Sequence, residues 1–428
     1  MYYTTLIDIY KHSPFRMLYT RSMSNKTLVD LDQWLAPYKH IIQARESYIS
    51  SMLKKTLGNK TPEEFAMGFL HFGLHKTDVG WTFREWAPNA TRMFLVGDFS
   101  DWKERKEFSL NRDKNGEWSI DLPENSLRHG QKYKLRVYWP GGDGWRLPSY
   151  ANYVVQDENS VDFSAVVWSP KTPYNWQNNS PPKPKVPLIY EAHVGMGSQE
   201  EKVASFSEFT TEVLPRIKES GYNTIQLMAI AEHPYYGSFG YHVSNFFAVS
   251  SRFGTPDDFK KLVDVAHGMG LRVIIDLVHA HAAKNEVEGL GNFASDPTQY
   301  FKPTNHPEWD SRLFDYGKPE VLHFLASNCR WWLDEYHIDG FRFDGVTSMI
   351  YHDHGLGKSF TSYDDYFRDN VDKDALAYLR LANETIHAVR PDATTIAEEM
   401  SGFPGLATST KNGGLGFDYR LQMGAPDL

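Results

Sequence analysis

From Leu188 to the end of the chain, short apolar segments typical of strands alternate with longer segments typical of helices. The alternating segments are Leu188–Val194, Phe206–Ser220, Thr224–Met228, Pro256–Met269 and Arg272–Val278. The run Val273–Ile275 is apolar at every position, as in a parallel strand that is covered on both faces. This alternation predicts a parallel sheet with crossover helices, and therefore an α/β fold for this part of the chain.

The part of the chain before residue 169 shows two other patterns. Apolar residues between Leu28 and Leu57 have the spacing of one or two amphipathic helices, with an interruption at Pro37. Short segments rich in β-forming residues follow, and Asn115–Gly116 offers a hairpin turn between two of them. Such segments predict a β-sandwich of about 100 residues. They are Trp81–Trp86, Met93–Val96, Glu117–Leu122 and Lys132–Tyr138.

Between these two parts, Ser169–Pro187 is so rich in proline that it continues neither a helix nor a central strand. We interpret it as a linker. The residues before Lys26 lack the apolar core of a secretory signal, and we expect a disordered leader there, with a transit peptide as the alternative. The expected parts are a leader over 1–26, a helical segment over 27–67, a sandwich over 68–168, the linker over 169–187 and a barrel-type domain over 188–428.

The amino-acid composition limits the kinds of molecule that the protein is expected to bind. The 428 residues carry a formal charge of −9, which argues against nucleic acid, because binding to phosphates depends on lysine and arginine. No segment approaches the roughly 20 apolar residues needed to cross a bilayer, so we expect no membrane partner. The single cysteine, Cys329, excludes an intrachain disulfide. We therefore expect a monomeric cytoplasmic protein.

Three short acidic segments lie where strands of the predicted sheet should end. They are Asp276–His281, Gly340–Asp344 and Thr395–Glu399. In a parallel α/β barrel, side chains at the carboxyl ends of different strands meet at one mouth. Carboxylates that lie far apart in the sequence are thus expected to come together there.

Alternation along the second segment places Arg342 and Asp344 on one face. A neighbouring arginine keeps a carboxylate ionised, as a glycosyl nucleophile requires, although a salt bridge at a strand end is an equally simple interpretation. Retaining glycoside chemistry needs a second carboxyl roughly 5 Å away that starts out protonated. Glu398 is the candidate for that group, whereas Glu399 should point the opposite way as a cap or surface acid.

Two further polar residues come from the first acidic segment. Asp276 and His281 would bind sugar hydroxyls or orient Arg342. The alternatives for His281 are an ordinary loop histidine or, with His279, half of a metal site. No third ligand follows at the spacing of a metal site, so we expect no metal and no cofactor.

The three acidic segments resemble the first three signature regions of the α-amylase superfamily, and the segments around them resemble the branching enzymes of glycogen and starch. The likeness covers about Gly68 to Leu428. It is carried by Tyr190–Gly195, Gln226–Ile230, Tyr236–Tyr241, Ser251–Pro256, Trp331–Leu333, Asp344–Met349 and Gly416–Leu421.

This resemblance implies a (β/α)8 TIM barrel behind an N-terminal β-sandwich, and an enzyme that cleaves α-1,4 bonds of glycogen, amylose or amylopectin and forms α-1,6 branches. It implies that Asp344 is the nucleophile and Glu398 the general acid and base. The alternatives are an α-glucan hydrolase or debranching enzyme, and a glucan-binding piece without activity. The residues that the resemblance assigns to sugar binding are Tyr241, Asp276, His281 and Arg342.

Two segments of the predicted sandwich also resemble a known domain. Trp86–Pro88 and Gly97–Trp102 resemble the carbohydrate-binding sandwich that precedes the barrel in branching enzymes and isoamylases. Trp86 and Trp102 are therefore candidates for stacking on glucan. The alternative is that both rings belong to the sandwich core.

The sequence departs from the family in three places. Two signatures differ from their usual sequences, at Ala280–Ala283 and at Ala397–Glu399. Neither difference changes a proposed catalytic residue. The fourth signature, a His-Asp pair that should follow the third region, does not occur between Glu399 and Leu428. Because only five or six strands can be counted after Leu188, we expect an incomplete barrel and a chain that is a piece of a longer protein.

Overall fold

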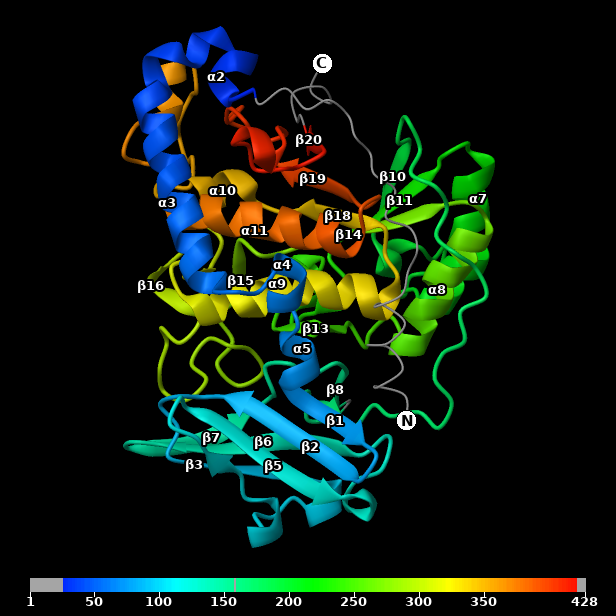
Figure 1. Cartoon of the computed structure of the whole chain (residues 1–428). Helices are drawn as coiled ribbons and strands as arrows, with labels where there is room; N and C mark the ends of the chain where they lie inside the picture. Colours follow the sequence, from blue (N-terminus) through cyan, green and yellow to red (C-terminus); the bar gives the residue numbers. More distant parts are fainter. Residues whose placement is uncertain (1–25, 158, 422–428) are drawn as a thin grey trace.

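The computed structural model describes residues 26–157 and 159–421, so the expected leader lies outside the described residues apart from Lys26. Figure 1 shows a β-sandwich at one end of the molecule and a parallel sheet flanked by helices at the other. This confirms the predicted β-sandwich followed by part of a barrel. In the part of the chain that is described, no helix has the length and apolar character needed to cross a lipid bilayer.

The N-terminal segment is helical and lies along the flank of the barrel-type domain. The long helix α3 (Lys39–Leu57) follows a 3-10 turn, η1 (Gln33–Tyr38), which contains Pro37. The predicted interruption at this proline is wrong, because the helical path only changes there from 3-10 to α-helix, and the break lies at Asp32. Helix α3 packs across α11 (Lys373–Val389), as Figure 1 shows. Three short helices complete the segment: α2 (Leu28–Leu31), α4 (Pro62–Phe65) and α5 (Gly68–His71).

The sandwich consists of two antiparallel sheets. The first has the order β1 (Gly73–Thr77), β2 (Gly80–Trp86), β5 (Glu117–Pro123), β4 (Asn111–Arg112). The second has the order β3 (Arg92–Gly97), β6 (Lys132–Trp139), β9 (Phe163–Val166), β8 (Val154–Gln156), with β7 (Gly142–Arg146) also paired to β6. Buried residues alternate with less buried ones along β6, so one face of this strand fills the core.

A closely packed joint connects the sandwich to the barrel-type domain. The ring of Tyr150 stacks on that of Phe247 with centroids 4.4 Å apart. Hydrogen bonds from side chains to main-chain carbonyls close the joint around this stack. They run from Asn89 Nδ2 to Ala294 at 2.7 Å, from Gln299 Nε2 to Trp86 at 2.7 Å, and from Arg146 Nε to Phe293 at 2.8 Å.

The barrel-type domain contains a six-stranded parallel sheet, and the predicted five or six strands are thus confirmed. Its order is β10 (Ile189–Ala192), β11 (Thr224–Leu227), β14 (Arg272–Leu277), β18 (Gly340–Phe343), β19 (Thr394–Glu398), β20 (Tyr419–Leu421). Residues 206–219 form one helical crossover as α6 (Phe206–Glu208), a π-helical turn (Phe209–Val213) and α7 (Leu214–Glu219). The other crossover helices are α8 (Pro256–Gly268), α9 (Pro319–Tyr336), α10 (Val346–Ile350) and α11.

Two small antiparallel sheets are inserted after strands of the parallel sheet. The first pairs β12 (Ala231–Glu232) with β13 (Asn245–Val249) after β11. The second follows β14 and has the order β15 (His281–Ala283), β17 (Ser311–Phe314), β16 (Phe301–Asn305). Both inserts extend from the carboxyl ends of strands, the edge at which the acidic segments end.

The expected linker contains no helix or strand, but it is bound along the barrel-type domain, and we call residues 169–187 the strap. The indole of Trp176 stacks on the His337 ring with centroids 4.0 Å apart. Lys183 Nζ donates to the carbonyl of Ala393 at 2.6 Å and lies 3.1 Å from the carboxylate of Asp418. The strap therefore holds the amino ends of the strands together.

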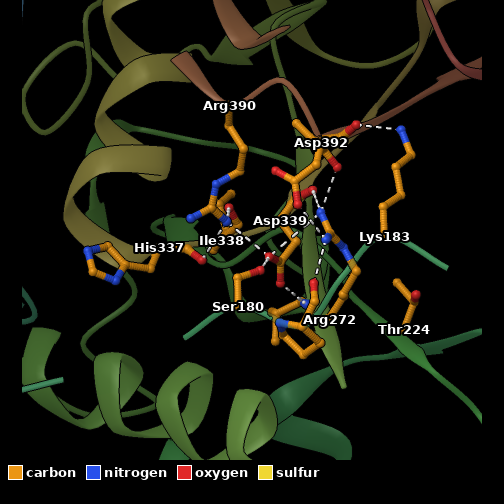
Figure 2. Close-up of polar contacts among 12 residues, drawn as sticks. Ser180, Lys183, Thr224, Arg272, His337, Ile338, Asp339, Arg390 and Asp392 are labelled. Atoms are coloured by element: carbon orange, nitrogen blue, oxygen red, sulfur yellow. Dashed lines mark hydrogen bonds and ion pairs between the residues drawn. The ribbon is translucent and has the colours of Figure 1, made fainter. Parts of the chain in front are cut away.

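A buried ionic network centred on Asp339, directly before β18, lies under the strap (Figure 2). Its carboxylate accepts hydrogen bonds from Arg390 at 2.9 Å, from His267 at 2.8 Å, and from the hydroxyl of Ser180 in the strap. Arg272 lies 3.8 Å from the same carboxylate. Burial alone would raise the pKa of Asp339, but His267 and the neighbouring charges hold it below its ordinary value.

Candidate active site

The predicted acidic residues meet at the carboxyl ends of β14, β18 and β19. Asp276 on β14 is in register with Arg342 on β18, which in turn is in register with Ile396 on β19. Asp344 directly follows β18, and Glu398 is the last residue of β19. Three strands thus deliver three carboxylates to one place, as strand ends of a parallel sheet allow.

Arg342 is the centre of this site, and it contacts all three carboxylates. Its Nη1 donates to Asp276 at 2.8 Å and to Asp344 at 3.0 Å. Its Nη2 lies 2.9 Å from Oε1 of Glu398. Because one guanidinium spans both, Asp344 and Glu398 are held beside each other, and the arginine side chain is only 8 % exposed.

The main chain after Asp344 also orients Glu398. Gly345 N–H donates to Oε2 of Glu398 at 2.8 Å. Gly345 has φ of +62°, and a Cβ there would lie 3.2 Å from both Ala280 and the indole of Trp309. A glycine is thus required, and sequence reasoning missed this role although the glycine directly follows the strand-end acid.

The protonation of the two carboxyls follows from their surroundings. Burial raises the pKa of Asp344, while Arg342 and a hydrogen bond with Glu398 oppose the rise. Burial raises the pKa of Glu398, and Asp344 adds to this both by its charge and by that hydrogen bond, against the effect of Arg342. Both carboxyls thus have raised pKa values, and the hydrogen bond between them acts in the direction that favours the proton on Glu398.

Asp276 is fully buried behind Arg342 and accepts a hydrogen bond from the Tyr241 hydroxyl at 2.6 Å. Burial raises the pKa of Asp276 to about 7, although Arg342 and Tyr241 oppose it. His281 Nε2 donates to the carbonyl of Tyr241 at 2.8 Å and so fixes the main chain of that residue. The structure thus brings Tyr241, Asp276 and His281 to the two carboxyls, with Asp276 placed to orient Arg342.

The neighbours of these residues serve other purposes. Of the two roles open for Glu399, the structure shows the cap, since its carboxylate is buried and accepts the N–H groups of Ser401, Gly402 and Phe403. His279 is buried, and both of its ring nitrogens bond to other side chains, those of Tyr378 and Asn328. No cluster of three or more metal-ligating side chains occurs among residues 26–157 and 159–421.

The two tryptophans of the sandwich lie in different surroundings. Trp86 is half-buried, and its ring meets Tyr300 of the barrel-type domain edge to face at 5.5 Å. Trp102 is 38 % exposed, and its Nε1 donates to Asp98 at 2.9 Å. Trp145 lies edge-on to Trp102 with centroids 6.4 Å apart. Trp102 is therefore the more open to a ligand.

Comparison with known families agrees with this arrangement. The profile of carbohydrate-binding module 48 (isoamylase N-terminal domain) matches residues 71–151, which form most of the sandwich. The profile of the alpha amylase catalytic domain matches residues 210–307. The second match includes β11, β14 and Asp276.

Curated relatives are similar over nearly the whole chain. The 1,4-alpha-glucan-branching enzyme of Dictyostelium discoideum is 46% identical over 96% of this chain and 62% of its own length. Those of Equus caballus and Solanum tuberosum are each 46% identical over 94% of this chain, covering 59% and 49% of their own lengths. The chain thus spans about half to three fifths of the length of these relatives.

Solved structures show the same fold at lower identity. Pullulanase from Bacillus acidopullulyticus matches with a TM-score of 0.60 at 19% identity, over 76% of this chain and 41% of its own. Apo pullulanase from Paenibacillus barengoltzii gives a TM-score of 0.61 at 21% identity, over 76% of this chain and 52% of its own. The chain is thus similar over nearly its whole length to curated branching enzymes, and it contains one segment matched by the carbohydrate-binding module 48 profile and one matched by the alpha amylase catalytic-domain profile.

Proposed function

We propose that the protein is a 1,4-alpha-glucan branching enzyme that acts by a retaining mechanism on Asp344 and Glu398. The observation that carries this proposal is the shared contact of both carboxyls with Arg342, at 3.0 Å and 2.9 Å. Two adjacent carboxyls, one ionised and one protonated, are what double displacement at a glycosidic carbon requires. The names of the curated relatives support the same activity.

In the first step, a carboxylate oxygen of Asp344 attacks the anomeric carbon of an α-1,4 bond. The bond to the leaving oxygen breaks as Glu398 gives that oxygen its proton. The non-reducing piece of the glucan is then held as an ester on Asp344. Arg342 stabilises the nucleophile in its ionised form before the attack.

In the second step, the 6-hydroxyl of a glucan chain attacks the same anomeric carbon. Glu398, now a carboxylate, takes the hydroxyl proton, and the bond from carbon to Asp344 breaks. The product is an α-1,6 branch, both carboxyls return to their first states, and no redox cofactor takes part. The substrate we propose is glycogen, amylose or amylopectin.

The sandwich is proposed to bind the same polymer, with Trp102 as a stacking surface, because its ring is exposed and the domain matches a carbohydrate-binding module. We place the protein in the cytoplasm as a monomer. The single cysteine, which lies buried on α9, supports a reducing compartment.

The test uses the full chain with amylose and two readouts, iodine staining and the number of reducing ends. Branching changes the stain without releasing many ends, whereas a hydrolase or debranching enzyme releases ends as it proceeds. We expect Asp344→Ala to lose activity by a factor of about 10⁴ or more. The matched control is Glu320→Gln, an exposed acid on α9, which should keep full activity.

A trapping experiment separates the two carboxyls. Glu398→Gln keeps the nucleophile, so with α-glucosyl fluoride, which needs no proton to leave, it should accumulate an ester that mass spectrometry locates on Asp344. Branching of amylose by Asp344→Ala at the wild-type rate, or an ester found on another residue, would refute the assignment.

A further inference from the structure

The insert that follows β14 brings two residues to the active site that the mechanism above does not use. The turn between β16 and β17 contains His306 and Trp309. The indole of Trp309 lies over Gly345, since a Cβ on that glycine would be 3.2 Å from Cη2 of the indole. Gly345 directly follows Asp344 and donates to Glu398, so Trp309 lies next to the residue that links the two carboxyls.

His306 is buried, and its tautomer follows from its contacts. Its Nδ1 accepts the N–H groups of Glu308 at 3.2 Å and Trp309 at 3.0 Å, so the ring proton is on Nε2. Burial lowers the pKa of His306 to about 4, which keeps the ring neutral at pH 7. Within the described part of the chain, Nε2 has no hydrogen-bond partner, although it is buried.

The adjacent His354 does not satisfy this donor. Its ring centroid lies 4.5 Å from that of His306, but its own Nδ1 contacts Ser348. An N–H group buried without a partner costs free energy, and an outside ligand with a hydroxyl would remove that cost.

Trp309 contacts both His306 and a second histidine. Its ring stacks on His306, with centroids 3.9 Å apart and planes inclined by 12°. The His281 ring is 5.0 Å from the same indole and tilted by 57°. Since Nε2 of His281 donates to Tyr241, its Nδ1 is an acceptor, and among the described residues it too has no partner.

A half-buried indole next to one unsatisfied donor and one unsatisfied acceptor matches the chemistry of a glucose ring, which combines an apolar face with hydroxyl groups. We propose that Trp309 and His306 contact the glucan bound at Asp344 and Glu398, the indole by apolar contact and His306 by donating from Nε2 to a hydroxyl. The proposal rests on the proposed function, because it assumes that a glucan occupies this site.

Two substitutions of His306 separate binding from folding. In His306→Asn, the side-chain oxygen can replace Nδ1 as the acceptor of the N–H groups of the turn, while the Nε2–H donor is lost. In His306→Gln, the terminal NH₂ replaces the Nε2 donor, while the acceptor for the turn is lost. We therefore expect Asn to weaken binding at an unchanged melting temperature, and Gln to lower the melting temperature while keeping most of the binding.

The probe is maltoheptaose, with its Kd measured by titration calorimetry on the full chain and KM and kcat measured with amylose. Trp309→Ala should raise Kd and KM by about fivefold to tenfold. Trp309→Phe should restore most of the affinity. The matched control is Trp34→Ala, which removes an indole that is 77% exposed on the N-terminal segment and should bind as wild type does.

Wild-type affinity in both Trp309→Ala and His306→Asn would overturn this inference alone, because Asp344→Ala would still test the chemistry. A lower melting temperature in His306→Asn with unchanged Kd would also overturn it, since the ring would then serve only the fold. A wild-type protein that neither binds maltoheptaose nor acts on amylose would overturn both the inference and the proposed function.

Discussion

The two ends of the parallel sheet have opposite arrangements of buried charge. At the carboxyl ends of the strands, one cation, Arg342, lies among the carboxylates of Asp276, Asp344 and Glu398. At the amino ends, one carboxylate, that of Asp339, lies among two arginines and a histidine. Each end is a buried ionic network around one residue whose charge is opposite to that of most of its neighbours, and at the amino ends Arg272 also pairs with the half-exposed Asp392 at 2.9 Å.

The two networks differ in whether the groups that are in excess, carboxylates at one end and guanidinium groups at the other, can change their charge. Carboxylates can take up a proton, so the surplus at the carboxyl ends appears as raised pKa values for Asp276, Asp344 and Glu398. Guanidinium groups do not lose their proton in proteins, so the cations at the amino ends must stay paired. One end can therefore exchange protons, whereas the other can only hold its charges in place.

The largest effect is expected at the amino ends. Asp339→Asn keeps the shape of the side chain but leaves Arg272 and Arg390 without their common partner in a buried place. We expect the free energy of unfolding to fall by about 3–5 kcal/mol, measured by urea denaturation. Asp392→Asn is the control, because its side chain is 52 % exposed where it pairs with Arg272, and it should cost less than about 1 kcal/mol.

At the carboxyl ends, removal of the central residue should act on catalysis instead. We expect Arg342→Gln to lower kcat/KM on amylose by about 10²–10³. Without the arginine, the three carboxyls that it contacted can stay uncharged only by binding protons. The loss of unfolding free energy should therefore be small at pH 5 and grow toward pH 8. Equal destabilisation at both pH values would show that the two networks respond alike.

A smaller effect tests the main chain of the site. Gly345→Ala forces a side chain onto a residue with φ of +62° and into Ala280 and Trp309. We expect kcat to fall by about 100-fold, since Glu398 loses its N–H donor or its position. Steady-state kinetics with amylose measures this. The melting temperature is the second readout, because a fall in activity only in proportion to unfolded protein would contradict a positioning role.

The smallest effect concerns pH. The folded pKa of Asp276 is about 7 against an ordinary 3.8, so the folded state binds the extra proton. Its contribution to stability is present below pH 3.8 and is lost as the pH rises through 7. In Asp276→Asn this loss is absent, and we expect the fall in unfolding free energy between pH 5.5 and 8 to be smaller by about 2 kcal/mol. Urea denaturation of both proteins across that range measures it, and identical slopes would contradict the assignment.

The fold could be predicted from sequence where a local pattern carries it. The all-apolar run at Val273–Ile275 predicts a buried strand, and Pro37 marks the change from a 3-10 turn to an α-helix rather than the predicted interruption. The acidic residues could be placed because they stand at strand ends, where topology brings side chains together. The roles of Asp344 and Glu398 stay predictions until the variants above are measured.

Other features could not be predicted because long-range contacts decide them. Nothing local in Ser169–Pro187 shows that it is bound to Asp339 and Ala393, which lie more than 150 residues further along. The same is true of Trp309, which reaches Gly345 only because the insert after β14 folds back over the strand ends. Nor could the sequence predict that Glu399 is buried under the turn that it caps, because the residues of that turn decide it.

The joint at Tyr150 and Phe247 has one more consequence. It combines a ring stack with buried hydrogen bonds from three side chains, and the strap adds a second attachment along the strand ends. The sandwich is therefore held against the barrel-type domain by contacts at two places. A glucan that contacted Trp102 and the carboxylate pair at once, as proposed above, would span a distance that these contacts keep constant.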